Sequence, residues 1–384
     1  MLDSSVSTYR AMREPVTECR SVLMVGTDLD GMGGVRAVVR GYLDAGLFER
    51  YHCVYVASHR AGSALVKIAT ALKAWARVAV LLRRLDAPLV HVQMASRGSF
   101  WRKSVVCLMA RAAGRPYIVH LHGGGFTRFY EEESGSLARR WIRSALAHAS
   151  LVIALSEQWR ERILRICPTA NVEVLHNAVA LPDIGRLQRS DDREPTLLFL
   201  GHLLRDKGVY DLLHAFARVL QKFPRARLVL AGIGDLEAVQ QLAAQLQISG
   251  QVSCPGWLGP EGKSAALSSS SVFLLPSYAE GMPMALLEAM SWALPVIATP
   301  VGGIPQVIEH EVNGLLVPAG DIESLARQME RLLADSLLRE RLGNTARARI
   351  ENDFSLSDAL ERLSAIYRRF GLEPRDPNRR WRND

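Results

Sequence analysis

Residues 271–288 read SVFLLPSYAEGMPMALLE. The run from Ser271 to Leu275 is short, continuous and apolar, which is typical of a strand buried on both faces of a parallel sheet. Gly281 and Pro283 then predict a loop that leads into a helix near Met284. Strand, loop and helix in this order predict one unit of an α/β fold.

Two series of such units predict an α/β fold with two doubly wound Rossmann-like domains. The strands expected in the first series lie at 20–26, 52–57, 89–93, 117–121 and 151–155, and those in the second at 196–200, 227–231, 271–275, 295–298 and 314–317. A chain of 384 residues also exceeds the size of one compact core. Open α/β sheets bind ligands at the carboxyl ends of their strands, so two such edges facing each other predict a cleft for two substrates.

The domain boundaries follow from a change in composition. Residues 181–195 are polar and without periodicity, and they contain Pro182, Gly185, Asp191, Asp192 and Pro195, which predicts a linker. We therefore expect an N-terminal domain at 1–180 and a C-terminal domain at 196–355. A helix at 356–371 is expected to pack back toward the N-terminal domain, and the charged tail at 372–384 is expected to be loose.

The composition excludes several classes of protein. Hydrophobic residues make up 48% and charged residues 22%, which is ordinary for a globular protein and excludes a disordered chain. No apolar run is long enough to span a bilayer, and the polar start of the chain predicts a cytoplasmic protein. Five scattered cysteines without a CxxC pair exclude a disulfide framework and a thiolate zinc site.

The positive charge is concentrated in the first half. Residues 1–190 contain 26 Lys and Arg against 15 Asp and Glu, whereas residues 191–384 contain 21 against 24. Within the basic half, residues 64–85 have an apolar helical stripe flanked by Lys and Arg: Leu65, Ile68, Leu72, Trp75, Ala79 and Leu82. This segment is either a helix that packs on the core or an interfacial helix on anionic lipid. Aromatic residues are not interleaved with the basic ones, so no nucleic acid is expected.

Two carboxylates stand out in the opening segment. Glu280 lies just before the expected helix and Glu288 one turn inside it. The free amides and the positive end of a helix suit an anion such as diphosphate. Carboxylates around that helix end can accept hydrogen bonds from sugar hydroxyls, although a capping acid and a solvated helical Glu would give the same pattern.

This segment and its surroundings resemble the retaining glycosyltransferases of the GT-B fold, specifically glycosyltransferase family 4. The motifs that carry the resemblance are Glu280 to Glu288, Gly201-His202-Leu203 with Lys207-Gly208, Ala231 to Gly234, Pro255-Gly256-Trp257, Ala298 to Pro305 and Asn313 to Val317. They cover most of 196–330, and 20–180 matches more loosely.

The resemblance implies roles for individual residues. Glu280 would contact the hydroxyls of the transferred hexose, and Glu288 the ribose hydroxyls. Lys207 would bind the donor diphosphate together with an Arg, but His202 stands at the position of that Arg, and Arg205 is close enough to replace it. The residues whose amides would face the donor are Gly281, Met282, Pro283 and Met284.

Two further implied positions lie in the first half. Gly33 and Gly34 resemble the glycine loop after the first strand, where a ligand approaches the backbone closely. His122 matches a His before Gly that lies near the donor sugar. His120 and His122 share one side of an extended strand, but no carboxylate or thiolate completes a set, so no metal is expected.

The resemblance implies a glycosyltransferase that moves a hexose from a nucleotide-diphosphate sugar to a glycan acceptor without a cofactor. The basic first half favours a polyprenyl-diphosphate-linked acceptor in exopolysaccharide or cell-surface polysaccharide synthesis, and a peripheral position on an anionic membrane surface, the inner face of the plasma membrane. Two alternatives stay open: a nucleotide-sugar epimerase or hydrolase on the same fold, and a non-catalytic nucleotide-sugar-binding module.

Overall fold

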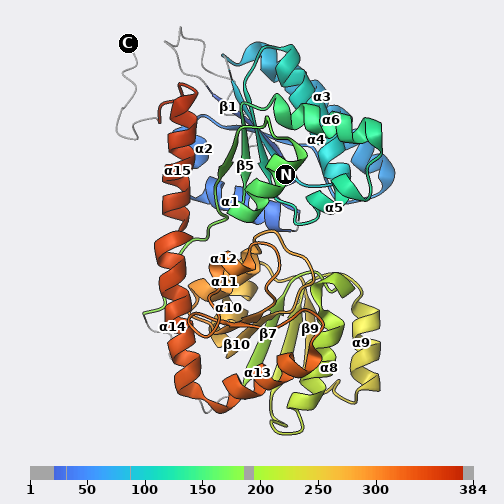
Figure 1. Cartoon of the computed structure of the whole chain (residues 1–384), viewed down its shortest axis with the longest axis vertical. Helices are drawn as coiled ribbons and strands as arrows, with labels where there is room; N and C mark the ends of the chain where they lie inside the picture. Colours follow the sequence, from blue (N-terminus) through green and yellow to red (C-terminus); the bar gives the residue numbers. More distant parts are fainter. Residues whose placement is uncertain (1–20, 32, 87, 186–193, 375–384) are drawn as a thin grey trace.

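The computed structural model of the chain contains two six-stranded sheets whose strands all pair in parallel (Figure 1). The structure describes residues 21–31, 33–86, 88–185 and 194–374. The first 20 residues, most of the expected linker and the end of the expected tail lie outside the described residues. The predicted fold class, two doubly wound Rossmann-like domains facing each other, is confirmed.

The N-terminal sheet has the strand order β2-β1-β3-β4-β5-β6. Its strands are β1 (Val22–Gly26), β2 (Val54–Ala57), β3 (Leu89–Met94), β4 (Tyr117–Leu121), β5 (Leu151–Ala154) and β6 (Val172–Val174). Its helices are α1 (Gly34–Asp44), α2 (Leu47–Arg50), α3 (Ala64–Arg84), α4 (Gly98–Ala112), α5 (Phe126–Glu131), α6 (Ser136–Ala147) and α7 (Glu157–Ile166). The order reverses between β1 and β3, where such sheets bind ligands.

The C-terminal sheet has the order β12-β11-β10-β7-β8-β9. Its strands are β7 (Thr196–Leu200), β8 (Arg227–Ala231), β9 (Val252–Gly256), β10 (Val272–Leu275), β11 (Val296–Ala298) and β12 (Leu315–Leu316). Its helices are η2 (Arg205–Lys207), α8 (Val209–Val219), α9 (Leu236–Gln245), α10 (Pro260–Ser269), α11 (Met284–Ser291), α12 (Ile304–Val307), α13 (Ile322–Ala334) and α14 (Ser336–Asp353). Its order reverses between β7 and β10.

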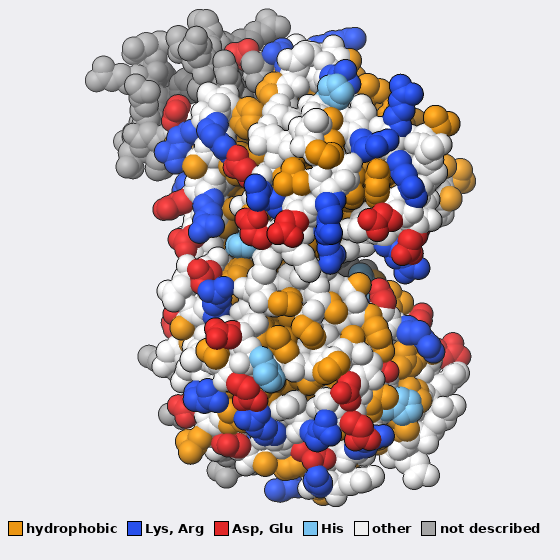
Figure 2. All heavy atoms as spheres, in the orientation of Figure 1, with side chains coloured by type: hydrophobic (Ala, Val, Ile, Leu, Met, Phe, Trp, Pro, Cys, Tyr) orange, Lys and Arg blue, Asp and Glu red, His pale blue; other side chains and the backbone are white. Residues whose placement is uncertain are grey.

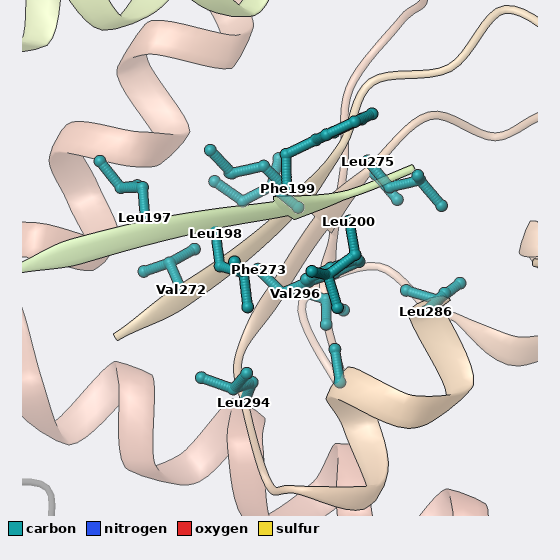
Figure 3. Close-up of a cluster of buried hydrophobic side chains, with 14 of the residues drawn as sticks. Leu197, Leu198, Phe199, Leu200, Val272, Phe273, Leu275, Leu286, Leu294 and Val296 are labelled. Atoms are coloured by element: carbon teal, nitrogen blue, oxygen red, sulfur yellow. The ribbon is translucent and has the colours of Figure 1, made fainter. Parts of the chain in front are cut away.

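Apolar strands and helices fix the loops that carry the site. Phe199 of β7 and Phe273 of β10 are fully buried (Figure 3). Leu286 of α11 is buried in the same cluster, so α11 is held against the sheet at the end of β10. Burying side chains of this size stabilises the fold by about 1.5–3 kcal/mol each. The start of α11 is therefore placed firmly beside the carboxyl ends of β7 and β10.

The last helix, α15 (Leu356–Arg369), runs beside the N-terminal body although it follows the C-terminal one (Figure 1). Tyr367 is fully buried there, and its hydroxyl lies 2.7 Å from Nδ1 of His91. Arg369 forms a bidentate ion pair with Glu173, with both N–O distances at 2.6 Å. The last helix of the chain therefore packs on the N-terminal body, although it directly follows α14 of the C-terminal body.

The apolar stripe predicted in α3 does not face the core along its whole length. The core face consists of Ala71, Ala74, Val78 and Leu82. Leu65, Ile68 and Leu72 are instead 78%, 57% and 55% exposed. The core-facing interpretation is wrong for the first half of this helix, because small alanines allow it to pack closely on another side. No helix in the described ranges is both long and apolar enough to cross a membrane.

Candidate functional site

The carboxyl ends of the two sheets meet at the loop after β4 and the loop after β10. A Cβ on Gly124 would lie 2.6 Å from the carbonyl carbon of Glu280 and 2.8 Å from the amide nitrogen of Gly281. Only glycine permits this approach. Asn177, also from the first half of the chain, contacts the same loop of the second half: its Nδ2 donates to the carbonyl oxygen of Met282 at 2.7 Å. The loop that contains Glu280 therefore lies against the loop after β4, where a Cβ on Gly281 would lie 3.3 Å from the carbonyl oxygen of His122.

Glu280 and Lys207 form an ion pair at this boundary. Lys207 Nζ lies 2.9 Å from Glu280 Oε1, and the side chains are only 21% and 12% exposed. Ser277 Oγ donates to the same carboxylate oxygen at 2.8 Å. Lys207 reaches the site from η2, because Gly208 adopts a left-handed conformation that lets the loop pack against Pro276. The carboxylate and the ammonium are therefore held side by side between β7 and β10.

The loop from Gly281 to Pro283 leads into α11 as predicted, with Met284 as the first helical residue. The amide of Gly303 donates to the carbonyl of Gly281 at 2.6 Å, which fixes the turn. Pro283 occupies the N-cap position, and no side chain caps the helix there. The start of α11 therefore follows the loop that contains Glu280 directly, and the first amides of a helix favour an anion.

Glu288 has a partner that the sequence analysis does not identify. Lys263 of α10 forms an ion pair with Oε1 of Glu288, and the two side chains are 33% and 18% exposed. The two residues lie 25 positions apart, and no local motif connects them. The pair places a second carboxylate on α11, one turn beyond its start.

His122 lies where β4 ends, and its amide donates to the carbonyl of Met94 at 2.7 Å. Its Nε2 lies 2.6 Å from Gln93 Oε1, and its ring lies against that of His120, with centroids 4.2 Å apart. Burial, followed by the charge of Lys103, lowers the pKa of His122 to about 3. The ring is therefore neutral near pH 7 and acts as a hydrogen-bonding group rather than a cation.

The remaining predicted residues are less closely gathered. His202 and Arg205 are exposed, and the guanidinium of Arg205 stacks 5.7 Å above the ring of Tyr210. Gly33 has φ 119, which favours glycine, and lies immediately before α1. A Cβ on Gly33 or Gly34 would meet no atom within 4 Å, so open space surrounds this turn. Their predicted roles toward the donor stay predictions.

In the part of the chain that the structure describes, no group of three or more His, Cys, Asp or Glu side chains is arranged to hold a metal ion.

Each half of the chain matches the model of a known protein family. The family described as "Glycosyl transferase 4-like domain" matches residues 34–178, and "Glycosyl transferases group 1" matches residues 184–349. The chain belongs to the group 1 glycosyltransferases. The resemblance stated from the sequence motifs is confirmed, and so is the assignment as a glycosyltransferase enzyme. The epimerase, hydrolase and binding-module alternatives are not favoured.

Named relatives of this glycosyltransferase include two bacterial enzymes. It is 27% identical to alpha-D-kanosaminyltransferase of Streptomyces kanamyceticus over 78% of this chain and 84% of that one. It is 29% identical to the amylovoran biosynthesis glycosyltransferase AmsK of Erwinia amylovora, over 58% of this chain and 57% of that one.

Solved structures share the fold of this glycosyltransferase. Sucrose-phosphate synthase from Thermosynechococcus elongatus superposes with a TM-score of 0.75 at 21% identity, over 92% of this chain and 99% of that one. HepE from Anabaena, solved with UDP-glucose, superposes with a TM-score of 0.70 at 19% identity, over 91% of this chain and 99% of that one. At these identities the superpositions establish the fold alone.

Proposed function

We propose that this glycosyltransferase moves a hexose from a nucleotide-diphosphate sugar to a glycan acceptor with retention of the anomeric configuration. The ion pair between Glu280 and Lys207, beside the start of α11, is the observation that carries the proposal. It places a hydrogen-bond acceptor for sugar hydroxyls next to a cation for phosphate. The likeness to HepE, which was solved with UDP-glucose, supports a donor of this class.

In the proposed reaction the acceptor oxygen attacks the anomeric carbon on the face from which the diphosphate leaves. The bond from that carbon to the phosphate oxygen breaks, the new glycosidic bond forms, and a donor phosphate oxygen receives the acceptor proton. Lys207 and the first amides of α11 stabilise the charge that develops on the diphosphate. Neutral His122 binds a donor hydroxyl, and Glu280 orients the hexose. No cofactor enters this scheme.

We propose that Glu288 binds the ribose hydroxyls of the donor. Its carboxylate lies on the same helix as the diphosphate-binding amides, and Lys263 holds it in place. A carboxylate accepts hydrogen bonds from two neighbouring hydroxyls well.

The acceptor in this proposal is a glycan linked to polyprenyl diphosphate, and the enzyme rests on the cytoplasmic face of the plasma membrane. Lys and Arg side chains are spread over the N-terminal body (Figure 2). On α3, exposed Leu65, Ile68 and Leu72 lie among Lys67 and Lys73, a composition that suits an anionic lipid surface. Several relatives are named for amylovoran, colanic acid or capsular polysaccharide biosynthesis, which supports an acceptor in cell-surface polysaccharide synthesis.

A thermal-shift panel of nucleoside diphosphates and nucleotide sugars tests the donor. We expect one nucleotide to raise the melting temperature of the wild-type protein, and a smaller shift for Glu288→Ala. Proton NMR of the product formed with that donor gives the anomeric configuration, and an inverted product would contradict the mechanism. If no nucleotide stabilises the protein, the proposed donor class is wrong.

Co-sedimentation with vesicles tests the membrane surface. We expect binding to vesicles that contain anionic lipid at low salt, and weaker binding for the variant Leu65→Ser/Ile68→Ser. The variant Leu137→Ser, which changes another exposed leucine at 80% exposure, is the matched control. Equal binding by all three proteins would show that α3 is not the contact.

A further inference from the structure

A buried cation that the proposed donor site does not use lies on α4, the helix that follows β3. Lys103 of α4 is 2% exposed, and its Nζ donates to Ser99 Oγ at 3.0 Å. Within the described part of the chain it forms no ion pair with a carboxylate. Burial and the charge of Arg102 lower the pKa of Lys103 to about 7. Burying an ammonium without a counter-charge is unfavourable, which suggests that an anion binds here.

Other basic groups gather around Lys103. Nε of Arg102 and Nδ1 of His59 are shielded from solvent, and neither has a hydrogen-bond partner among the described residues. Burial and the charges of Arg102, Lys103 and Lys67 lower the pKa of His59, against an opposing effect of Asp28. His59 follows β2, Arg102 and Lys103 belong to α4, which follows β3, and these two strands flank β1 in the sheet.

This basic cluster adjoins the reacting centre. The charge of Lys103 also lowers the pKa of His122, which lies beside the Glu280 loop. Asp28, the carboxylate that acts on His59, is already paired with Arg60 at 3.4 Å. Because Asp28 is paired with Arg60, the positive charge of the cluster remains available to an anionic ligand.

An apolar groove on the surface shares Arg102 with this cluster. It has a volume of about 230 Å³ and is lined by Lys67, Ile68, Ala71, Leu72, Trp75 and Arg102. The indole nitrogen of Trp75 donates to the carbonyl of Arg102 at 2.9 Å, so α3 and α4 are tied together along its floor. Lys67 and Arg102 are the charged residues of this lining, and the rest is apolar. An apolar groove that also has two cations in its lining matches a molecule with a hydrocarbon chain and an anionic head.

We infer that Lys103, Arg102 and His59 bind the diphosphate of a polyprenyl-diphosphate-linked acceptor, and that its first isoprene units lie in the groove between α3 and α4. This inference rests on the lipid-linked acceptor of the proposed function. Guanidinium and ammonium groups suit phosphate oxygens because each forms charge-assisted hydrogen bonds. The acceptor sugar would then extend from this cluster toward His122, where the donor sugar is expected.

Calorimetric titration of the full-length protein with farnesyl diphosphate tests the inference. The donor site is first saturated with the nucleoside diphosphate selected in the thermal-shift panel, so that the probe cannot occupy it. We expect Lys103→Met and Arg102→Gln each to weaken binding by about ten- to hundredfold. Lys222→Met, a change at an exposed lysine of the C-terminal body, is the matched control and should bind normally. Titrations in buffers of different ionisation enthalpy should show more proton uptake at pH 7.5 for the wild type than for Lys103→Met, because bound diphosphate raises the pKa of Lys103.

A second titration with inorganic diphosphate separates the head group from the chain. We expect farnesyl diphosphate to bind more tightly than inorganic diphosphate, and Leu72→Ser to remove that difference. Equal binding of both probes would overturn the groove as the site of the chain. Wild-type affinity in both Lys103→Met and Arg102→Gln would overturn the diphosphate site. Nucleotide binding without farnesyl diphosphate binding would refute this inference alone, whereas failure of nucleotide binding would refute the proposed donor.

Discussion

Gln93 Oε1 lies 2.6 Å from His122 Nε2, and Gln93 Nε2 lies 3.2 Å from His91 Nε2. An amide oxygen only accepts, so His122 has its proton on Nε2 and a free lone pair on Nδ1. The amide nitrogen only donates, so the proton of neutral His91 is on Nδ1, from which it donates to the hydroxyl of Tyr367 at 2.7 Å. This series of hydrogen bonds fixes the tautomer of His122, so that Nδ1 is the atom that can accept a hydrogen bond from a substrate.

Replacing Gln93 should therefore disturb His122. Gln93→Leu leaves the Nε2–H of His122 without an acceptor in a buried place, and we expect kcat to fall about tenfold. Nitrogen NMR shifts of His122 should show the Nε2–H tautomer in the wild type and lose it in the variant. Tyr367→Phe removes the hydroxyl that accepts from His91, two hydrogen bonds away from His122, and should lower kcat less. An unchanged tautomer in Gln93→Leu would rule out this positioning role.

The pair of Glu280 and Lys207 should dominate catalysis. We expect Glu280→Gln and Lys207→Met each to lower kcat/KM by about a hundredfold or more, because each removes charge from the place where the sugar–phosphate bond breaks. Ser277→Ala removes only one hydrogen bond to the carboxylate of Glu280 and serves as the control, with a smaller loss. Steady-state kinetics with saturating acceptor measures these effects. If the two charged variants retain full activity, the site is elsewhere.

Glu288 should act on donor binding rather than on the chemical step. We expect Glu288→Ala to raise the KM for the donor with a smaller effect on kcat. A donor that lacks one ribose hydroxyl should lose affinity for the wild type but not for the variant. Lys263→Met removes the partner of Glu288 while keeping the carboxylate, so its KM should change less. Equal discrimination between the two donors by wild type and Glu288→Ala would argue against the ribose contact.

Buried His91 and His120, together with half-buried His122, should make the N-terminal body sensitive to acid. Burial lowers the pKa of His91 and His122 to about 3, and burial with the charge of His122 lowers that of His120 well below its usual value. The unfolded chain binds these protons below about pH 6.5 and the folded chain does not, so stability falls as pH drops below 6.5. Each histidine contributes up to ~1.4 kcal/mol per pH unit. His120→Phe should reduce this slope in denaturant unfolding at pH 4.5–7, and an unchanged slope would contradict the buried neutral state.

Lys103 should act at higher pH. Its pKa is lowered from 10.5 to about 7 in the folded protein, so the unfolded chain binds the extra proton between these values. Stability should therefore rise with pH through this window, and the cost of the buried charge is largest below pH 7. Relative to the wild type, Lys103→Met should be most stabilising at pH 6–7 and progressively less so toward pH 10. A stability difference that does not vary with pH would show that Lys103 stays charged.

Much of the fold could be predicted from local patterns. Strands such as Val272–Leu275 are apolar without interruption, because helices cover both faces of a parallel sheet. Such a run can be recognised in a single sequence. The short edge strands β6 and β9 were not predicted, because half-exposed edges such as Ser253 and Glu173 break that apolar pattern. On α3 the larger apolar residues did not predict the core-facing side. Ala71 and Ala74 pack on the core instead, and alanine contributes little to a hydrophobic pattern.

The sequence alone determined the two-domain α/β fold, the start of α11 and the family, because each depends on residues that are neighbours along the chain. The loop and helix pattern around Gly281 and Pro283 pointed to Glu280 and Glu288 as candidates, and the family resemblance added Lys207. Only the tertiary structure decided which groups meet: Lys263 with Glu288, Gln93 with His122, and Tyr367 with His91. Those contacts join residues far apart in sequence, and burial and pairing are properties of three-dimensional packing that no local pattern records.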